Sequence, residues 1–126
     1  MAKTVLIVED NELNMKLFHD LLEAHGYQTV GTRNGIEALD LARKHKPDLV
    51  LMDYQLPGMN GVEALARLRE NPSMTETPVV ALTASAMRED RERFLAAGFD
   101  GYLTKPIDVR EFGNQVRGFL KSESGA

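Results

Sequence analysis

Hydrophobic residues gather in three short runs along the chain, each with almost no polar residue inside it. The runs lie at residues 5–8, 49–52 and 79–82 and are rich in valine and leucine. A continuous apolar run of this length is typical of a strand covered on both faces, as in a parallel sheet. Two shorter, more polar runs at 28–30 and 101–104 are typical of edge strands. The pattern therefore predicts five strands.

Between these runs, apolar side chains recur at steps of three and four residues, which is the spacing of amphipathic helices. The repeating positions are Leu13, Leu17, Leu21, Leu39, Ala42, Val62, Leu65 and Leu68. Gly26, Pro47, Pro72 and Gly98 follow the first four helical segments and mark their ends. Each gap between strands is long enough for a parallel crossover. We therefore predict a flavodoxin-like, doubly wound α/β fold with five parallel strands in the order 2-1-3-4-5 and five helices.

Three predicted helix starts share the same sequence pattern. Asn34, Asn60 and Asp108 each stand three residues before a glutamate, as in a capping box. The spacing predicts that these three side chains cap the second, third and fifth helices.

Length and charge limit the kind of protein this is. A chain of 126 residues suits one domain, so we expect a single domain over 1–126 with no output domain and a loose tail at 122–126. The net charge of −4 argues against nucleic acid as a partner. No apolar run approaches the length that spans a membrane, and none resembles a signal peptide. The chain has no cysteine, which a reducing compartment permits, so we expect a cytoplasmic protein.

Polar residues follow the ends of the predicted strands. They are Glu9 and Asp10, then Asp53, Thr83 and Lys105. The carboxyl ends of parallel strands meet at one edge of the sheet, so these side chains are expected to converge. Three crowded carboxylates repel one another unless a cation lies among them. Their hard oxygen atoms, with no His or Cys nearby, favour Mg²⁺ or Mn²⁺.

Such a cluster suits phosphoryl transfer, in which catalysis is mostly positioning and charge neutralisation. The carboxylate of Asp53 can attack phosphorus, and an aspartyl phosphate is a known type of covalent intermediate. Lys105 and the metal can hold the phosphoryl oxygens, and Thr83 can donate a hydrogen bond to one of them. For any single residue, an ordinary role in a turn or a helix cap is equally compatible with the sequence.

Four ordered motifs cover essentially the whole chain and resemble the receiver domain of two-component response regulators. The motifs are residues 5–11, 51–61, 82–84 and 102–106. The resemblance implies that Asp53 is the phosphoacceptor and that Thr83 and Lys105 bind the phosphoryl group. It also implies a cis peptide bond between Lys105 and Pro106. The metal ligands that it implies are Glu9, Asp10, Asp53 and the backbone carbonyl of Gln55.

The resemblance also implies a conformational switch. Thr83 moves toward the phosphate, Tyr102 turns inward, and the face made by the fourth helix, fifth strand and fifth helix changes. Arg88 to Arg93 fit such a face, although a solvated helix of alternating charge explains them equally well. Gln55 and Ser85 occupy positions that in the family tune dephosphorylation.

The implied partners are a sensor histidine kinase or phosphatase, or a histidine phosphotransfer protein, together with a downstream protein target. The protein would be a monomer or a phosphorylation-dependent dimer, and it would turn over no metabolite of its own. Residues 8–23 further resemble single-domain cell-cycle regulators of the DivK type, which implies a role in cell-cycle or cell-division control.

Two other functions and one other kind of site fit the sequence less well. A metal-dependent phosphatase or nuclease commonly has an Asp-x-Asp pair, but residues 53–55 lack the second acid. The phosphate loop of an FMN carrier is rich in Ser, Thr and Gly, whereas residues 9–12 are acidic and would repel a phosphate. His19, His25 and His45 have no metal-ligand spacing and are expected on the surface.

Overall fold

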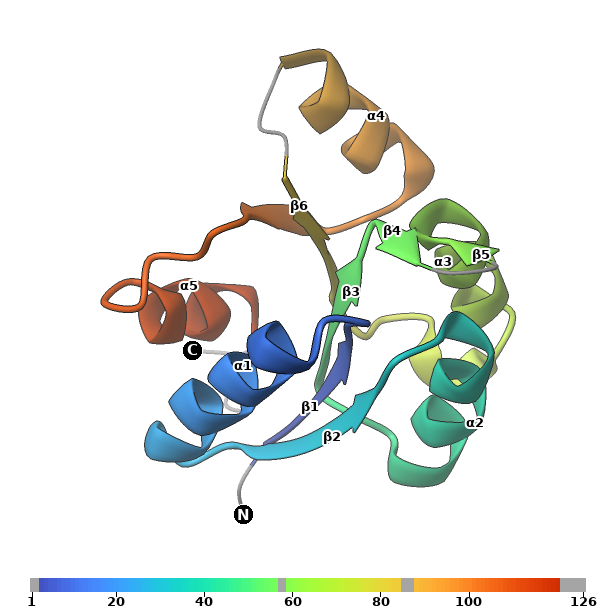
Figure 1. The fold of residues 1–126 in the computed structure, drawn as a ribbon. Coiled ribbons are helices and arrows are strands. Elements are labelled where there is room, and N and C mark those ends of the chain that lie inside the picture. Colours follow the sequence, from blue (N-terminus) through green and yellow to red (C-terminus); the bar gives the residue numbers. More distant parts are fainter. Residues whose placement is uncertain (1–2, 57–58, 85–87, 121–126) are drawn as a thin grey trace.

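The computed structural model describes residues 3–56, 59–84 and 88–120. Its main sheet has five parallel strands in the spatial order β2-β1-β3-β6-β7, as Figure 1 shows. These strands are β1 (Thr4–Val8), β2 (Gln28–Thr32), β3 (Leu49–Asp53), β6 (Val79–Thr83) and β7 (Gly101–Thr104). The predicted strand order 2-1-3-4-5 is therefore confirmed. A small antiparallel pair that the pattern did not predict, β4 (Gln55–Leu56) and β5 (Met59–Asn60), follows β3.

The helices cover both faces of the sheet (Figure 1). They are α1 (Glu12–Ala24), α2 (Gly35–His45), α3 (Gly61–Arg69), α4 (Arg88–Ala97) and α5 (Phe112–Phe119), with a short 3₁₀ helix η1 (Pro72–Met74) after α3. Side chains of α1 and α5 pack on one face, and side chains of α2, α3 and α4 pack on the other. This is the doubly wound arrangement that alternating strands and helices produce.

Two hydrophobic clusters form the core because successive strand residues point to opposite faces. Val5 and Ile7 of β1 face α1 and α5, while Leu6 and Val8 face α2 and α3. On the first face, Phe18 and Phe112 stack with ring centroids 5.4 Å apart and join α1 to α5. Each large side chain buried in this way contributes about 1.5–3 kcal/mol. These two-sided contacts hold the strand ends in register.

The predicted helix caps have mixed outcomes. Asn34 caps α2 as predicted, since its side-chain oxygen accepts a hydrogen bond from the Glu37 amide at 2.7 Å. The side chain of Asn60 lies outside the described residues. The prediction for Asp108 is wrong, because α5 begins later, at Phe112.

The loop before α5 explains the error at Asp108. Its carboxylate accepts a hydrogen bond from the Arg110 amide at 2.9 Å, which closes a local turn of the kind that Asp favours. A cap that the glutamate spacing missed is Asn11, whose side chain accepts a hydrogen bond from the Asn14 amide at 2.9 Å and starts α1. A glutamate at the third position is thus neither sufficient nor necessary for a cap here.

Other predictions concern the surface and the ends of the chain. His19, His25 and His45 are exposed, as predicted. The proposed tail at 122–126 lies outside the described residues. Across the described ranges, no helix combines the length and the apolar character needed to cross a membrane.

Candidate functional site

Four parallel strands bring the predicted site residues to one edge of the sheet. Glu9 directly follows β1, and its backbone amide donates to the carbonyl of Thr32 at 3.0 Å. Asp53 and Thr83 are the last residues of β3 and β6, and Lys105 directly follows β7. The register of the sheet therefore sets how far each side chain projects beyond the edge.

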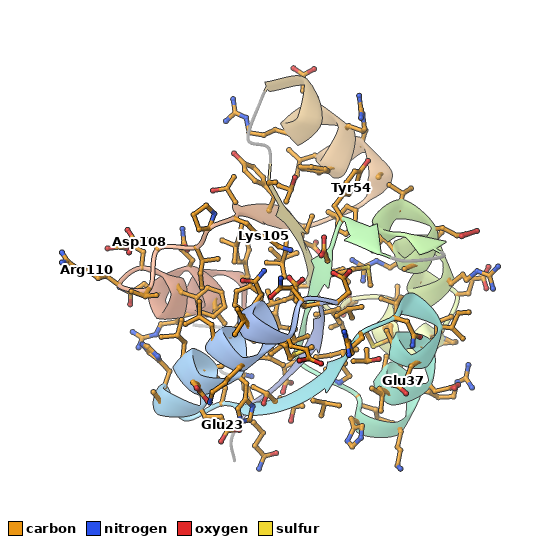
Figure 2. All side chains as sticks on the ribbon, viewed as in Figure 1. Glu23, Glu37, Tyr54, Lys105, Asp108 and Arg110 are labelled. Carbon is orange, nitrogen blue, oxygen red and sulfur yellow. The ribbon has the colours of Figure 1, made fainter. Side chains whose placement is uncertain are left out.

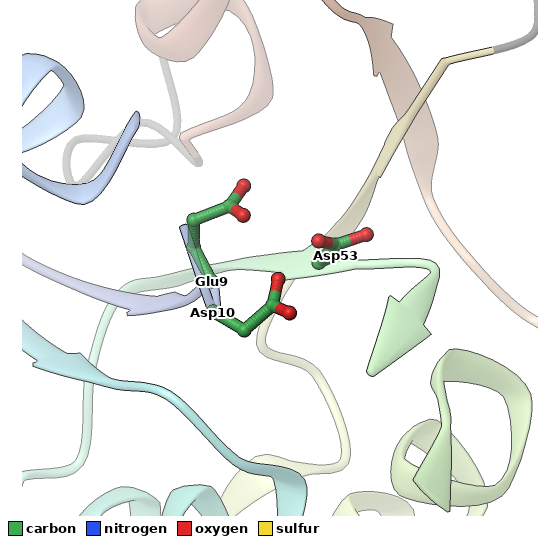
Figure 3. Close-up of side chains that lie close together, drawn as sticks. All are labelled: Glu9, Asp10 and Asp53. Carbon is green, nitrogen blue, oxygen red and sulfur yellow. The ribbon is translucent and has the colours of Figure 1, made fainter. Parts of the chain in front are cut away.

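Three carboxylates meet at this edge, as Figure 3 shows. One carboxylate oxygen each from Glu9, Asp10 and Asp53 lies within 4.8 Å of the others. Glu9 is 1% exposed, Asp53 is 7% exposed, and Asp10 is half-buried. Buried like charges at this separation destabilise one another unless a cation compensates them.

Lys105 supplies part of that compensation. Its ammonium nitrogen lies 2.7 Å from Glu9 Oε1 and 3.0 Å from Asp53 Oδ2. Its backbone amide donates to the Thr83 carbonyl at 2.7 Å, and the peptide bond to Pro106 is cis. Three carboxylates and one ammonium still leave two negative charges uncompensated within this group.

Burial and hydrogen bonding shift the pKa values of two members of the group. Burial raises the pKa of Glu9 above its ordinary value, although Lys105 and the Asn11 amide, 3.1 Å from Glu9 Oε2, partly oppose the shift. The charge of Asp53 raises the pKa of Glu9 further. Burial alone would lower the pKa of Lys105, but the hydrogen bonds to Glu9 and Asp53 outweigh it and raise that pKa. Lys105 therefore stays charged.

A pocket of about 320 Å³ opens over Asp53. Its lining residues are Asp10, Asp53, Tyr54, Leu82, Thr83, Ala84 and Lys105. Asp53 can thus be reached from outside, with Thr83 and Lys105 at the same pocket. The sequence patterns did not indicate Tyr54, and the signal that could have found it is its place directly after Asp53.

The other predicted residues have different positions. Gln55 lies in β4, two residues beyond Asp53, where its backbone pairs with Asn60; its side chain lies outside the described residues, as does Ser85. Tyr102 is half-buried on β7, with its ring centroid 6.1 Å from that of Phe94 in α4. Of the charged segment expected on the switch face, the side chains at 91–93 are exposed.

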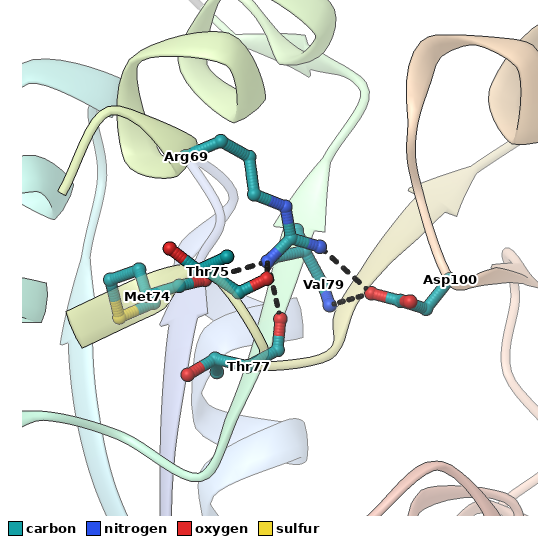
Figure 4. Close-up of polar contacts among 6 residues, drawn as sticks. All are labelled: Arg69, Met74, Thr75, Thr77, Val79 and Asp100. Carbon is teal, nitrogen blue, oxygen red and sulfur yellow. Dashed lines mark hydrogen bonds and ion pairs between the residues drawn. The ribbon is translucent and has the colours of Figure 1, made fainter. Parts of the chain in front are cut away.

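A second polar cluster, which the sequence reasoning did not find, lies at the opposite end of β6 (Figure 4). The guanidinium of Arg69 donates to the carbonyls of Met74 at 2.8 Å and Thr77 at 2.6 Å. It also donates to Asp100 Oδ2 at 2.9 Å, and the same oxygen accepts from the Val79 amide at 2.8 Å. We call these residues the Arg69 clasp. The clasp joins α3 and η1 to the corner between α4 and β7.

The donor set at the carboxyl edge fits a divalent metal ion. Glu9, Asp10 and Asp53 offer hard oxygen ligands within 4.8 Å of one another. The chain has no cysteine, and its three histidines lie elsewhere on the surface. Carboxylate oxygens with room for water are the ligands that Mg²⁺ and Mn²⁺ take in proteins. These three residues would hold the ion.

The fold and this site together define a known class of signalling domain. The family model of the response regulator receiver domain matches residues 5–117, so the chain belongs to the receiver domain family. The chain is also 53% identical to the polar-differentiation response regulator DivK of Brucella anthropi, over 95% of this chain and 98% of that protein. It is 52% identical to DivK of Brucella ovis over the same shares.

Solved structures agree with this family. The chemotaxis response regulator CheY4 of Vibrio cholerae is 27% identical, with a TM-score of 0.91 over 95% of this chain and 100% of that one. The receiver domain of a sensor histidine kinase from Pseudomonas aeruginosa is 33% identical, with a TM-score of 0.87 over 97% of this chain and 100% of that one. The latter was solved with a magnesium ion coordinated in its active site cleft.

Proposed function

We propose that this protein is a response regulator that accepts a phosphoryl group on Asp53 from a phosphohistidine. The donor is a sensor histidine kinase or a histidine phosphotransfer protein. The observation that carries the proposal is the position of Asp53, which lines an open pocket with its Oδ2 3.0 Å from the Lys105 ammonium. Two further carboxylates, from Glu9 and Asp10, stand beside it. No other group in the described ranges combines an accessible carboxylate with these neighbours.

The transfer is a displacement at phosphorus. A carboxylate oxygen of Asp53 attacks, the P–O bond forms as the P–N bond of the donor breaks, and the imidazole leaves with a proton. Lys105 and Thr83 hold the phosphoryl oxygens. Glu9, Asp10, Asp53 and the Gln55 carbonyl would hold a Mg²⁺ or Mn²⁺ ion, which would supply charge neutralisation for the incoming group. Water later hydrolyses the aspartyl phosphate at a rate that Gln55 and Ser85 tune.

The signal leaves through protein contact and not through turnover of a metabolite. Thr83 moves toward the phosphoryl group, Tyr102 turns inward, and the face formed by α4, β7 and α5 changes for a downstream protein. Phosphorylation acts by shifting an existing equilibrium between two conformations, which requires it to favour one by a few kcal/mol. The chain acts as one domain, as a monomer or as a phosphorylation-dependent dimer.

The biological setting follows from the relatives. Identity of 53% to a polar-differentiation response regulator supports a role in cell-cycle or cell-division control, with a kinase and a phosphatase as partners. A net charge of −4 favours protein partners over nucleic acid. We place the protein in the cytoplasm, where kinase domains that use ATP operate.

The test is incubation with excess acetyl phosphate and Mg²⁺, followed by intact-mass measurement and peptide mapping. We expect a single phosphoryl adduct on the peptide that contains Asp53, because among the described carboxylates this one combines access from the pocket with a contact to Lys105. A chelator should greatly reduce the adduct. A phosphorylated histidine kinase should give the same product. An adduct mapped to another residue, or one unaffected by the chelator, would contradict the proposal.

The switch needs its own variant. Tyr102→Ala should still form the adduct but weaken the response of a partner protein, measured as the change in affinity on phosphorylation. An unchanged response would remove Tyr102 from the mechanism.

A further inference from the structure

Tyr54 connects the phosphoacceptor pocket to helix α4. It follows Asp53 in the chain, and it lines the pocket of about 320 Å³ above that residue. Its ring meets the ring of Phe94 edge to face, with centroids 4.6 Å apart and an interplanar angle of 66°. In Figure 2, Tyr54 lies on the side of the site toward α4, away from Lys105. One residue thus lines this pocket and contacts α4 through its ring.

The backbone of Tyr54 is held from both sides. Its amide donates to the Leu82 carbonyl at 2.9 Å, and its own carbonyl accepts from the Gly61 amide at 2.8 Å. Gly61 packs so closely that a Cβ there would lie 3.0 Å from Tyr54 Cα and 3.1 Å from its carbonyl oxygen. The main chain of Tyr54 is therefore fixed, and its side chain is the part that is free to respond to a change at the pocket.

Helix α4 depends on Phe94 for its attachment. Among its described side chains, 91–97, Phe94 alone is buried, and the neighbouring Leu95 is 56% exposed. By contrast, α1 buries both Phe18 and Leu22. The centroid of the Phe94 ring is 4.6 Å from that of Tyr54 and 6.1 Å from that of Tyr102. Any shift of Phe94 therefore moves the main anchor of α4.

We infer that Tyr54 is a positioning residue that transmits the state of Asp53 to α4 through Phe94, by a route that does not pass through Thr83. The inference rests on the proposed phosphorylation of Asp53. A phosphoryl group adds negative charge beside the ring, and the face of an aromatic ring repels an anion while its edge attracts one. Rotation of the ring repacks Phe94, and close-packed interiors transmit such displacements. Phosphorylation would thereby loosen or shift α4.

The test is hydrogen exchange at the α4 amides of residues 91–97, with and without acetyl phosphate and Mg²⁺, compared at equal adduct occupancy measured by intact mass. In the unaltered protein, phosphorylation should change these exchange rates. In Tyr54→Leu, the phosphorylation-dependent change should shrink by at least about twofold, the lower end of what an edge-to-face pair contributes to an equilibrium. Tyr54→Phe keeps the ring and should retain the full change.

Tyr27→Leu is the matched control, because Tyr27 is also partly buried but packs against the core cluster on the opposite face. It should leave the phosphorylation-dependent change at α4 intact. A purely structural role for Tyr54 would alter exchange equally in both states and leave their difference unchanged, which would overturn the inference. Loss of the change in Tyr54→Phe would overturn it as well. If the unaltered protein forms no adduct, the proposed function fails instead.

Discussion

The two ends of the central sheet differ in how far their charged side chains are compensated by neighbours. At the carboxyl end, Glu9, Asp10 and Asp53 crowd together, and Lys105 compensates only part of their charge. At the amino end of β6, Arg69 and Asp100 pair at 2.9 Å. The guanidinium also donates to two backbone carbonyls, and the Asp100 carboxylate also accepts from the Val79 amide (Figure 4). One end has an excess of negative charge, and the other is balanced.

This difference distinguishes a functional cluster from a structural one. Charged groups whose hydrogen bonds go to one another and to the backbone stabilise the fold and have little capacity left to bind a ligand. An uncompensated group of carboxylates costs stability, and a divalent cation and a phosphoryl group can relieve that cost when they bind. The excess negative charge of its own residues therefore identifies the site at the carboxyl edge as a binding site. The charge balance and mutual hydrogen bonds of the Arg69 clasp identify it as a structural cluster.

The largest expected effect comes from making the same substitution at each end. Asp53→Asn should abolish the phosphoryl adduct formed with acetyl phosphate, since an amide oxygen is a far weaker nucleophile than a carboxylate. Asp100→Asn should leave the adduct unchanged, because Asp100 lies at the other end of the sheet. Intact mass measures both. An adduct that persists in Asp53→Asn would remove this residue as the acceptor.

Mg²⁺ affinity should depend on the carboxyl end of the sheet and not on the amino end of β6. Asp10→Asn removes one of the three clustered carboxylates, so we expect Mg²⁺ affinity to fall by at least about 10-fold, the loss typical of even an outer partner of a metal ligand. Titration calorimetry measures it. Asp100→Asn, with the same change of charge, should keep the original affinity. Equal losses in both variants would show that net charge, and not the cluster, governs binding.

The free energy of unfolding should depend on the Arg69 clasp at the amino end of β6. Arg69→Met removes the guanidinium that donates to the Met74 and Thr77 carbonyls and to Asp100, and we expect a loss of about 2 kcal/mol in the free energy of unfolding by urea. The figure is moderate because the Asp100 side chain is 48% exposed and water can replace part of the pairing.

Arg43→Met provides the control for this loss. Arg43 pairs with Asp40 at 3.7 Å, with both side chains more than two-thirds exposed, so its loss should cost less than about 0.5 kcal/mol. Similar losses in the two arginine variants would mean that the clasp contributes no more than a surface ion pair.

The smallest effect is a pH dependence with opposite signs for metal binding and stability. The pKa of Glu9 is raised above its ordinary value, so the Glu9 carboxyl group binds a proton more tightly in the metal-free folded protein than in the unfolded chain. The free energy of unfolding of the unaltered protein, relative to that of Glu9→Gln, should therefore increase as pH falls from neutral through that raised pKa. Mg²⁺ affinity should decrease over the same range, because binding requires the carboxylate. Urea unfolding measures the free energy of unfolding across this pH range, and calorimetry measures Mg²⁺ affinity. If both quantities changed in the same direction, Glu9 could not be a metal ligand with a raised pKa.

Much of the fold could be read from the order of residues. The three apolar runs are β1, β3 and β6, and the short polar runs are the edge strands β2 and β7. Alternation of strand and helix forces a parallel sheet, so Glu9, Asp53, Thr83 and Lys105 had to meet at one edge. Local sequence was less reliable at helix starts, as Asp108 shows, because a side chain can close a turn instead of capping a helix.

The sequence by itself determined which side chains gather at the carboxyl edge, because apolar runs and helical spacing are local patterns, and their alternation along the chain implies a parallel sheet. Only the tertiary structure decided the burial of Glu9, the two contacts of Lys105, the Arg69 clasp and the place of Tyr54 between Asp53 and Phe94. Each of these joins residues from separate elements, and Arg69 and Asp100 are 31 positions apart. Such contacts depend on how helices pack against the sheet, which no run of neighbouring residues specifies.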